Sequence, residues 1–397
     1  MEKPILNMAV IGPSQSGKTT LIKAILATLP HLPGLEYPII LGADALDKTP
    51  EEKQADRTAH IHRVLFETKR YMVSCVDTPG DPAHMKNAVL GIAGADVVVI
   101  VTTEEAALPR DGVSRLSEYY AICSDKQTVL PFLNLNVTKA EIEYMELHAT
   151  EPAEMTCGSA QLALEVASSD MHPAKIYYAN EIQCVQRLIA LIDKQELRRE
   201  QRDATFVMPV QVIHRRKTPS PLLVGIVESG TVQAGDVLTV AGRHYNAPKQ
   251  VTVQQIQAFY NDREPALPGD CISVEVECKN PEHLSAGDCL FAQEEGLLPT
   301  KQLCHRIRVL LHMFSREECG RRKPYFGGFK PQFYFNGISR TGVIFPESEE
   351  YAMFCPGQTF DAAVELITPL PLTLRDRGIL MANGHAIGEC FVTDIMA

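Results

Sequence analysis

The feature that most constrains the fold is a glycine-rich loop that joins an apolar segment to a helical pattern near the start of the chain. Residues 5–11 are almost entirely apolar, which indicates a buried strand, and leucine and isoleucine recur at helical spacing after the loop. Between them lie Gly12, Gly17, Lys18 and Thr19 in the spacing Gly-x-x-x-x-Gly-Lys-Thr. Glycines let successive backbone N–H groups curl around an anion, and the N-terminus of the following helix adds a positive dipole. The order of strand, loop and helix therefore predicts a phosphate-binding loop.

We expect this loop to bind a nucleotide together with magnesium. Lys18 is expected to reach the terminal phosphates, and the Thr19 hydroxyl is an oxygen ligand of the kind that Mg²⁺ binds. The residues expected to contact the nucleotide here are Gly12, Ser14, Gln15, Ser16, Gly17, Lys18, Thr19 and Thr20.

A second motif, Asp77-Thr-Pro-Gly80, follows a predicted strand. An acid at this place can hold Mg²⁺ through water, and Gly80 can offer its N–H to a γ-phosphate. Thr58 lies between the two motifs and just before a strand, where a hydroxyl can join the metal ion and sense the γ-phosphate. We therefore expect Thr19, Thr58 and Asp77 around the metal ion. The alternative for the second motif is a plain turn at the end of a strand.

The composition describes an acidic globular chain. Its 397 residues suffice for two or three domains, and 45% hydrophobic residues supply packed cores. The net charge of −11 argues against a surface that is basic throughout, although a local basic patch is compatible with it. No apolar run is long enough to span a membrane, and the cysteines are scattered as in chains with free thiols. With no leader visible, we expect a cytoplasmic protein, or one in the mitochondrial matrix if a presequence is missing from this sequence.

The pattern of elements changes near residue 200. Before it, strands and helices alternate as in a doubly wound sheet, whose ligand chemistry gathers at the carboxyl ends of the strands. After it, short strands follow repeated Ala-Gly-Asp, Pro-Gly-Asp or Pro-Gly-Gln turns, which predicts antiparallel barrels. We expect three domains, at residues 1–198, 199–295 and 296–397. In the first, the expected strands are 8–11, 63–68, 71–77, 97–102, 128–134 and 154–156, and the expected helices include 19–29, 85–92 and 177–194.

Further motifs make the chain resemble the elongation factor Tu family over nearly its whole length. Beside the phosphate loop and the Asp-x-Pro-Gly motif, the first half carries Glu51-Glu-Lys, Thr58 and Met85-Lys-Asn87. The last third carries a long matching stretch, Pro324-Tyr-Phe-x-Gly-Phe-Lys-Pro-Gln-Phe-Tyr-Phe335. Shorter matches follow at Met353-x-x-Pro-Gly-Gln358, Val364-Glu-Leu-Ile-x-Pro369 and Gly384-x-x-Ile-Gly388.

The resemblance implies an α/β P-loop GTPase domain followed by two antiparallel β-barrels, with aminoacyl-tRNA gripped across all three. It implies GTP or GDP with Mg²⁺ as ligands, the ribosome as a partner, a possible nucleotide exchange factor, no membrane and a monomeric state. The residues that match the family's guanine contacts are Asn134, Ser159 and Ala160. The basic residues that match its tRNA surface are Arg321, Arg322, Lys323 and Arg377, although the first three also suit a solvated turn.

The chain departs from the family where the chemistry would occur. The family's water-orienting histidine, directly after Asp-x-Pro-Gly, is Asp81 here. A carboxylate at that place brings negative charge toward the γ-phosphate, so we expect hydrolysis to be slow or absent, with Gly80 and Asp81 as the candidate catalytic residues.

The family's guanine-reading sequence, Asn-Lys-x-Asp, corresponds to Asn134-Leu-Asn-Val137 in this chain, which leaves open whether guanine is preferred over adenine. In the first barrel, Tyr260 replaces an arginine of the aminoacyl-end surface.

Three functions are compatible with these observations. The chain is either an elongation factor that delivers aminoacyl-tRNA, a hydrolysis-poor nucleotide-binding switch or decoy, or a scaffold that kept the fold and lost the ligand. An intact Gly17-Lys18-Thr19 with Asp77 argues against the scaffold, because an unused loop has no physical reason to keep its lysine.

Overall fold

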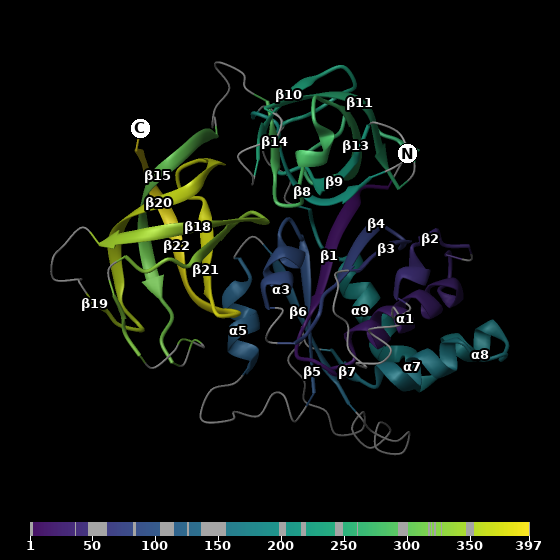
Figure 1. The fold of residues 1–397 in the computed structure, drawn as a ribbon. Helices are drawn as coiled ribbons and strands as arrows, with labels where there is room; N and C mark the ends of the chain where they lie inside the picture. The colour runs from purple at the N-terminus through teal and green to yellow at the C-terminus, as the bar shows by residue number, and fades with distance from the viewer. Residues whose placement is uncertain are drawn as a thin grey trace. The chain divides into compact units, whose positions relative to one another are not determined.

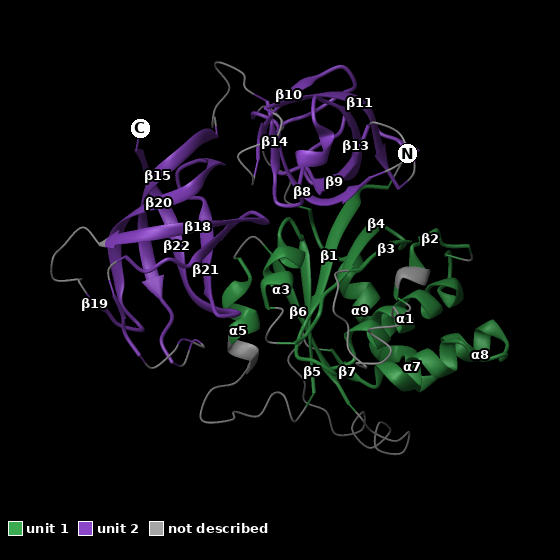
Figure 2. Ribbon diagram, in the orientation of Figure 1, with its two compact units in different colours: residues 1–198 green, residues 199–397 purple. Residues whose placement is uncertain are grey.

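The chain folds into two compact units, residues 1–198 and 199–397, each with a hydrophobic core of its own (Figure 2). The structure is a computed structural model. The residues that it describes are 3–35, 37–46, 62–81, 85–103, 115–124, 127–135, 156–197, 204–215, 220–242, 249–259, 261–292, 301–316, 318, 320, 323–326, 328–346 and 353–396.

The first unit is built on a seven-stranded sheet in the order β2-β3-β4-β1-β5-β6-β7 (Figure 1). The strands from β4 to β7 along this order are parallel, whereas β2 and β3 form an antiparallel edge. The sheet is therefore mixed, with the predicted α/β character in its parallel part. Its strands are β1 (Ile5–Ile11), β2 (Ile40–Leu41), β3 (His62–Glu67), β4 (Met72–Asp77), β5 (Val97–Thr102), β6 (Thr128–Asn134) and β7 (Thr156–Gly158).

Helices cover both faces of this sheet. On β1, the alternate residues Leu6, Met8 and Val10 point into the core that α1, α7 and α9 share, and α3 and α5 lie on the opposite face (Figure 1). No helix within the described ranges is long and apolar enough to cross a membrane. The helices are α1 (Lys18–Thr28), α3 (Met85–Ile92), α5 (Arg115–Ile122), α7 (Ala160–Ala167), α8 (Pro173–Tyr177) and α9 (Gln183–Asp193), with 3₁₀ turns η1 (Leu29–His31), η2 (Ala43–Leu46) and η4 (Asn180–Ile182).

The helix expected over 177–194 is present as α9 but is shorter, since it begins at Gln183 and ends at Asp193. Tyr177 instead ends α8, and Ala179 is extended with φ −72° and ψ 137°, so η4 and α9 begin afresh after it. The apolar residues Ile182, Val185, Leu188 and Ile189 do lie buried in the core as their spacing predicts. The hydrophobic period therefore identified the buried residues but not the break at Ala179, because the period marks buried positions and carries no signal for one extended residue.

The second unit contains two antiparallel barrels. In the first, strands follow the order β10-β14-β8-β9-β13-β11-β12, and pairing between β10 and β11 closes the sheet. Its strands are β8 (Val207–His214), β9 (Leu222–Ile226), β10 (Val237–Ala241), β11 (Gln250–Ala258), β12 (Asn261–Asp262), β13 (Cys271–Glu277) and β14 (Cys289–Phe291), with a 3₁₀ turn η5 (Pro281–His283).

The second barrel closes in the order β15-β20-β18-β17-β21-β22, and segments between its strands form a separate two-stranded sheet of β16 and β19. The strands of the barrel are β15 (Gln302–Met313), β17 (Gln332–Phe335), β18 (Ile338–Pro346), β20 (Thr359–Leu372), β21 (Arg377–Ala382) and β22 (His385–Met396), and those of the small sheet are β16 (Tyr325–Phe326) and β19 (Met353–Phe354). Two closed antiparallel barrels after an α/β unit with a mixed sheet confirm the predicted architecture.

The repeated glycine turns that predicted the barrels share one geometry. Each glycine has positive φ, and the side chain directly after it accepts a hydrogen bond from the backbone N–H three residues earlier. A left-handed backbone with this side-chain bond reverses the chain at little steric cost, which is why the pattern recurs between strands. The four turns place Asp236 against Gln233, Asp270 against Leu267, Asp288 against Ser285 and Gln358 against Cys355.

Candidate functional site

The glycine-rich loop connects β1 to α1, and its backbone requires glycine at both Gly12 and Gly17. Gly12 has φ 144° and Gly17 has φ 88°, which side-chain-bearing residues rarely adopt. A Cβ at Gly12 would collide with the carbonyl oxygen of Val101, and a Cβ at Gly17 would collide with the side-chain amide of Asn134. The loop is therefore packed from behind by the ends of β5 and β6.

Lys18 starts α1 and folds back over this loop. Its Nζ donates to the carbonyl oxygens of Gly12 at 3.1 Å and Pro13 at 2.7 Å, and the side chain is buried. Burial lowers the pKa of Lys18 to about 8, although the nearby Asp77 carboxylate partly opposes this effect. An ammonium held this way is oriented in advance toward an anion on the loop.

The Asp-x-x-Gly motif reaches the same place from the end of β4. Thr19 Oγ1 donates to Asp77 Oδ2 at 2.6 Å, which joins the two motifs directly. Thr78 anchors the segment, since its backbone N–H and its hydroxyl both donate to the carbonyl oxygen of Val10. Gly80 then packs so closely that a Cβ would collide with Lys18 Nζ and would lie 2.5 Å from the carbonyl oxygen of Gly12.

The oxygens gathered here fit the metal ion that the sequence predicts. A threonine hydroxyl and a buried carboxylate are hard oxygen ligands, and Mg²⁺ in proteins binds through one or two such groups with substrate phosphates. Asp81 follows as a half-buried residue next to Gly80. Thr58, the third residue expected near the metal ion, lies outside the described residues.

The side of the site where a base would lie is formed by the ends of β6 and β7. Asn134 Nδ2 donates to the carbonyl oxygen of Ser16 at 2.8 Å, and its Oδ1 accepts from the backbone N–H of Ala160 at 3.0 Å. Ser159 caps α7, because its side chain accepts from the N–H of Leu162. Asn134 thus contacts the phosphate loop directly, Ala160 is joined to the loop through Asn134, and Ser159 precedes Ala160 as the cap of α7. Asn136 and Val137 lie outside the described residues.

The residues expected to contact tRNA belong to the second unit. Lys323 is exposed just before β16, whereas Arg377 is half-buried at the start of β21 and its Nε donates to Glu389 Oε2 at 2.8 Å. This ion pair offsets part of the charge that Arg377 would offer to a phosphate. Arg321, Arg322 and Tyr260 lie outside the described residues.

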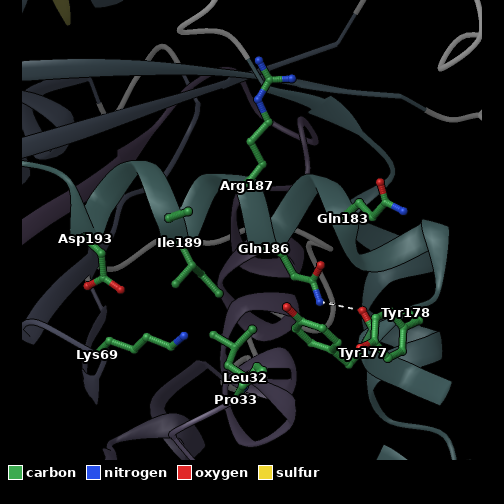
Figure 3. Close-up of a pocket in the computed structure, with 11 residues that line it drawn as sticks. Leu32, Pro33, Lys69, Tyr177, Tyr178, Gln183, Gln186, Arg187, Ile189 and Asp193 are labelled. Atoms are coloured by element: carbon green, nitrogen blue, oxygen red, sulfur yellow. Dashed lines mark hydrogen bonds between the residues drawn. The ribbon is translucent and has the colours of Figure 1, made fainter. Parts of the chain in front are cut away.

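Elsewhere in the first unit, a hollow of about 520 Å³ has none of the phosphate-loop residues in its lining. Figure 3 shows the residues that line it. It is lined by the side of α9, by Tyr177 at the end of α8 and by Lys69 in the turn before β4. Lys69 precedes β4, whereas Asp77 is its last residue. The hollow therefore lies at the amino ends of the strands, and the phosphate loop lies at their carboxyl ends.

Sequence reasoning did not find two groups that shape the site. The carbonyl oxygen of Val101 lies behind Gly12, and Thr78 fixes the start of the Asp-x-x-Gly segment. A backbone carbonyl carries no residue-specific signal, and Thr78 falls on a position that the motif leaves free. Only the neighbouring strands reveal these two roles.

Comparisons with known proteins agree with this geometry. Residues 3–136 match the model of the elongation factor Tu GTP binding domain. The chain is 28% identical over 415 residues to the chloroplastic elongation factor Tu of Coleochaete orbicularis, which covers 98% of this chain and 95% of that protein. Its fold is similar to that of the translation elongation factor SelB of Methanococcus maripaludis, solved in complex with the GTP analogue GppNHp. That match has a TM-score of 0.68 and 16% identity, and it covers 100% of this chain and 80% of the other. Residues 3–136 thus match an elongation factor Tu GTP binding domain, and the whole chain, both barrels included, is similar in sequence to an elongation factor Tu and in fold to SelB.

Proposed function

We propose that this chain is a nucleotide-dependent factor that delivers aminoacyl-tRNA to the ribosome during elongation. The observation that carries the proposal is the convergence of Lys18, Thr19, Asp77 and Gly80 at one edge of the sheet. The proposed delivery of aminoacyl-tRNA is supported by the alignment with an elongation factor Tu over nearly the full length of both chains, because the alignment includes the barrels as well as the nucleotide domain.

In this proposal the phosphates are held by the chain's own loop and lysine. Lys18 and the N–H groups of the loop bind the β and γ phosphates, with the N-terminus of α1 behind them. Thr19 would ligate Mg²⁺ directly, Thr58 would join it and Asp77 would lie in the outer shell. The metal ion supplies neutralisation of charge on the phosphate oxygens. The close approach of Gly80 to Lys18 supports a role for the Gly80 N–H in sensing whether a γ-phosphate is present.

A second candidate function follows from one residue. Asp81 stands where a group that accepts a hydrogen bond from water would lie, but it is an acid beside a polyphosphate. The negative charge of the Asp81 carboxylate would repel the negative charge on the phosphate oxygens in the transition state, and this repulsion favours slow hydrolysis. The second candidate is therefore a switch or decoy that binds nucleotide and tRNA and releases them without efficient turnover.

The remaining assignments are part of the same proposal. Arg321, Arg322, Lys323 and Arg377 are proposed to contact the tRNA backbone, with Arg377 the weakest because of its pairing to Glu389. The compartment is proposed to be one where translation takes place, the cytoplasm or an organelle matrix.

Two assays on the full chain separate the candidates. In the first, the protein loaded with Mg²⁺-GTP is mixed with aminoacyl-tRNA, and protection of the aminoacyl ester from spontaneous hydrolysis is followed. In the second, single-turnover GTP hydrolysis is measured with and without programmed ribosomes. Ester protection with ribosome-stimulated hydrolysis is the result expected of a delivery factor.

Other outcomes identify the alternatives. Ester protection without hydrolysis would support the switch or decoy and overturn delivery. Lys18→Ala, which removes the phosphate-binding ammonium, serves as the control and should bind neither nucleotide nor tRNA. If the unmodified chain, like Lys18→Ala, bound no nucleotide, the scaffold would be the one candidate function left.

A further inference from the structure

We infer that the hollow beside α9 is a binding site for a free aromatic α-amino acid. Its volume of about 520 Å³ is in the range of cavities that hold small ligands. All of its lining residues belong to the described part of the first unit, and none of them belongs to the phosphate loop. This site is therefore separate from the proposed nucleotide function and does not depend on it.

One end of the hollow carries a cation and an anion. Asp193 is the last residue of α9, and Lys69 lies in the turn between β3 and β4 (Figure 3). The helix end and the turn are joined, because the backbone N–H of Arg70 donates to Asp193 Oδ1 at 3.3 Å and Arg70 Nη1 donates to the Asp193 carbonyl oxygen at 3.4 Å. Lys69, directly before Arg70 in the chain, is therefore held near the Asp193 carboxylate.

These two charges are open to a ligand. Lys69 is exposed, and its ammonium has no hydrogen bond or ion pair with any described residue. Among the same residues, none donates to the second carboxylate oxygen of Asp193, Oδ2. The C-terminus of α9 adds partial negative charge beside that carboxylate. A cation and an anion therefore lie close together without pairing with each other.

An α-amino acid fits this arrangement because it carries an ammonium and a carboxylate on the same carbon. Its carboxylate would pair with Lys69 and its ammonium with Asp193, each through a charge-assisted hydrogen bond. A ligand with one of these charges alone would face a like charge in the site and be repelled by it. Arg187 also lines the hollow, but its guanidinium extends away from Leu32 and Tyr177 in Figure 3, so it leaves this balance unchanged.

The remainder of the hollow suits an aromatic side chain. Leu32 and Ile189 are buried and supply apolar surface to its lining. Tyr177 packs edge-on against Tyr178, with ring centroids 4.9 Å apart and an angle of 78° between the rings. Gln186 Nε2 donates to the carbonyl oxygen of Tyr177 at 2.9 Å, which fixes the end of α8 against α9 (Figure 3). A planar ring would therefore meet apolar contacts and an aromatic partner that is already held in place.

The test uses L-tryptophan, whose indole fluorescence can be followed because the chain contains no tryptophan. The full chain is added to the amino acid, and binding is measured as a rise in fluorescence anisotropy. Tryptamine lacks the carboxylate and indolepropionate lacks the ammonium, and we expect each to bind at least about tenfold more weakly than L-tryptophan. Equal affinity for all three compounds would overturn the inference. So would no rise in anisotropy at protein concentrations up to about 1 mM.

Two charge variants test the two halves of the site separately. Lys69→Met should weaken L-tryptophan binding by about tenfold or more without weakening tryptamine binding. Asp193→Asn keeps an oxygen that can accept from Arg70, and it should weaken L-tryptophan binding as much without weakening indolepropionate binding. Lys194→Met removes an exposed lysine outside the lining and, as the control, should change the affinity by less than about threefold. Equal losses for L-tryptophan and for the analogue in both variants would show that these residues only shape the hollow, and would overturn the inference.

Discussion

The Thr19 hydroxyl and the Asp77 carboxylate, 58 residues apart in the chain, form a hydrogen bond of 2.6 Å. This bond places the first turn of α1 against the end of β4, so the phosphate loop and the Asp-x-x-Gly segment form one site. The pairing exists because β1 and β4 are neighbours in the parallel sheet, with Val10 opposite Asp77. Two oxygens this close define where a metal ion bound to phosphates would lie.

Thr19→Ala should remove most of the magnesium-dependent part of nucleotide affinity, because it deletes the hydroxyl that would ligate the ion. We expect affinity for GTP in magnesium to fall by at least about tenfold, equivalent to ~1.4 kcal/mol, with little change in EDTA. Titrations in both conditions measure this difference. Thr19→Ser keeps the hydroxyl and is the matched control. An equal loss of nucleotide affinity with and without magnesium would show that Thr19 stabilises the conformation of the loop and does not bind the metal ion.

Gly80→Ala should weaken GTP binding more than GDP binding. A Cβ at this position would meet Lys18 Nζ and the carbonyl oxygen of Gly12, so the segment must shift away from the place that a γ-phosphate would occupy. We expect affinity for GTP to fall about tenfold and affinity for GDP to change by less than about threefold. Competition between the two nucleotides measures the ratio. The same loss for both would mean that the clash displaces Lys18 itself.

Asp81→His should raise intrinsic hydrolysis if the remainder of the site is competent. The substitution removes a negative charge near the γ-phosphate and supplies a neutral group that can position water. We expect a rise of about a hundredfold in the single-turnover rate, the lower end of what a positioned proton acceptor contributes. Asp81→Asn separates the two effects, because it removes the charge and supplies no base. No rise in either variant would locate the defect beyond this residue.

Nucleotide affinity should fall as the pH rises through about 8, the pKa to which burial lowers Lys18. Phosphate needs the ammonium form, so binding above this pH must take up close to one proton. Calorimetric titration at pH about 9 in two buffers of different ionisation enthalpy measures the uptake. Absence of proton uptake would show that Lys18 is already charged in the free protein.

The same shift has the opposite effect on stability. The folded pKa of Lys18 lies below its ordinary value of 10.5, so between about 8 and 10.5 the unfolded chain binds more protons than the folded one. This group therefore makes the nucleotide-free chain more stable as the pH rises across that window.

Lys301→Met should destabilise the second unit. Lys301 is buried between Glu228 of the first barrel at 2.5 Å and Asp376 of the second at 3.2 Å. Burial lowers the pKa of Lys301, but the two carboxylates together outweigh this effect and hold the pKa above its ordinary value. Removing the ammonium leaves two acids facing one another, and breaking a buried pair in this way costs about 3 kcal/mol or more. Denaturant unfolding of the full chain measures the loss. Lys249→Met removes an exposed lysine of the same unit and should cost less than about 0.5 kcal/mol.

The sequence by itself determined the bounds of several local elements and the positions of the glycine turns. The expected bounds 97–102, 128–134 and 85–92 coincide with β5, β6 and α3. The four glycine turns were also confirmed, since the sequence places glycine where φ must be positive. These features depend on hydrophobic period and backbone preference, which act over a few residues and can be read from neighbours in the chain.

The tertiary structure decided what depends on distant residues. Arg375 adopts φ 69° in a turn where Asp376 accepts from Thr373 as in the glycine turns, yet no glycine marks it. The bonds from Asn134 to Ser16 and to Ala160 join segments 118 and 26 residues apart. A sequence shows which groups can donate or accept, but strand order decides which of them meet. The motifs therefore predicted a phosphate site, whereas only the packed ends of β6 and β7 showed that its base-side groups are already bonded to the protein.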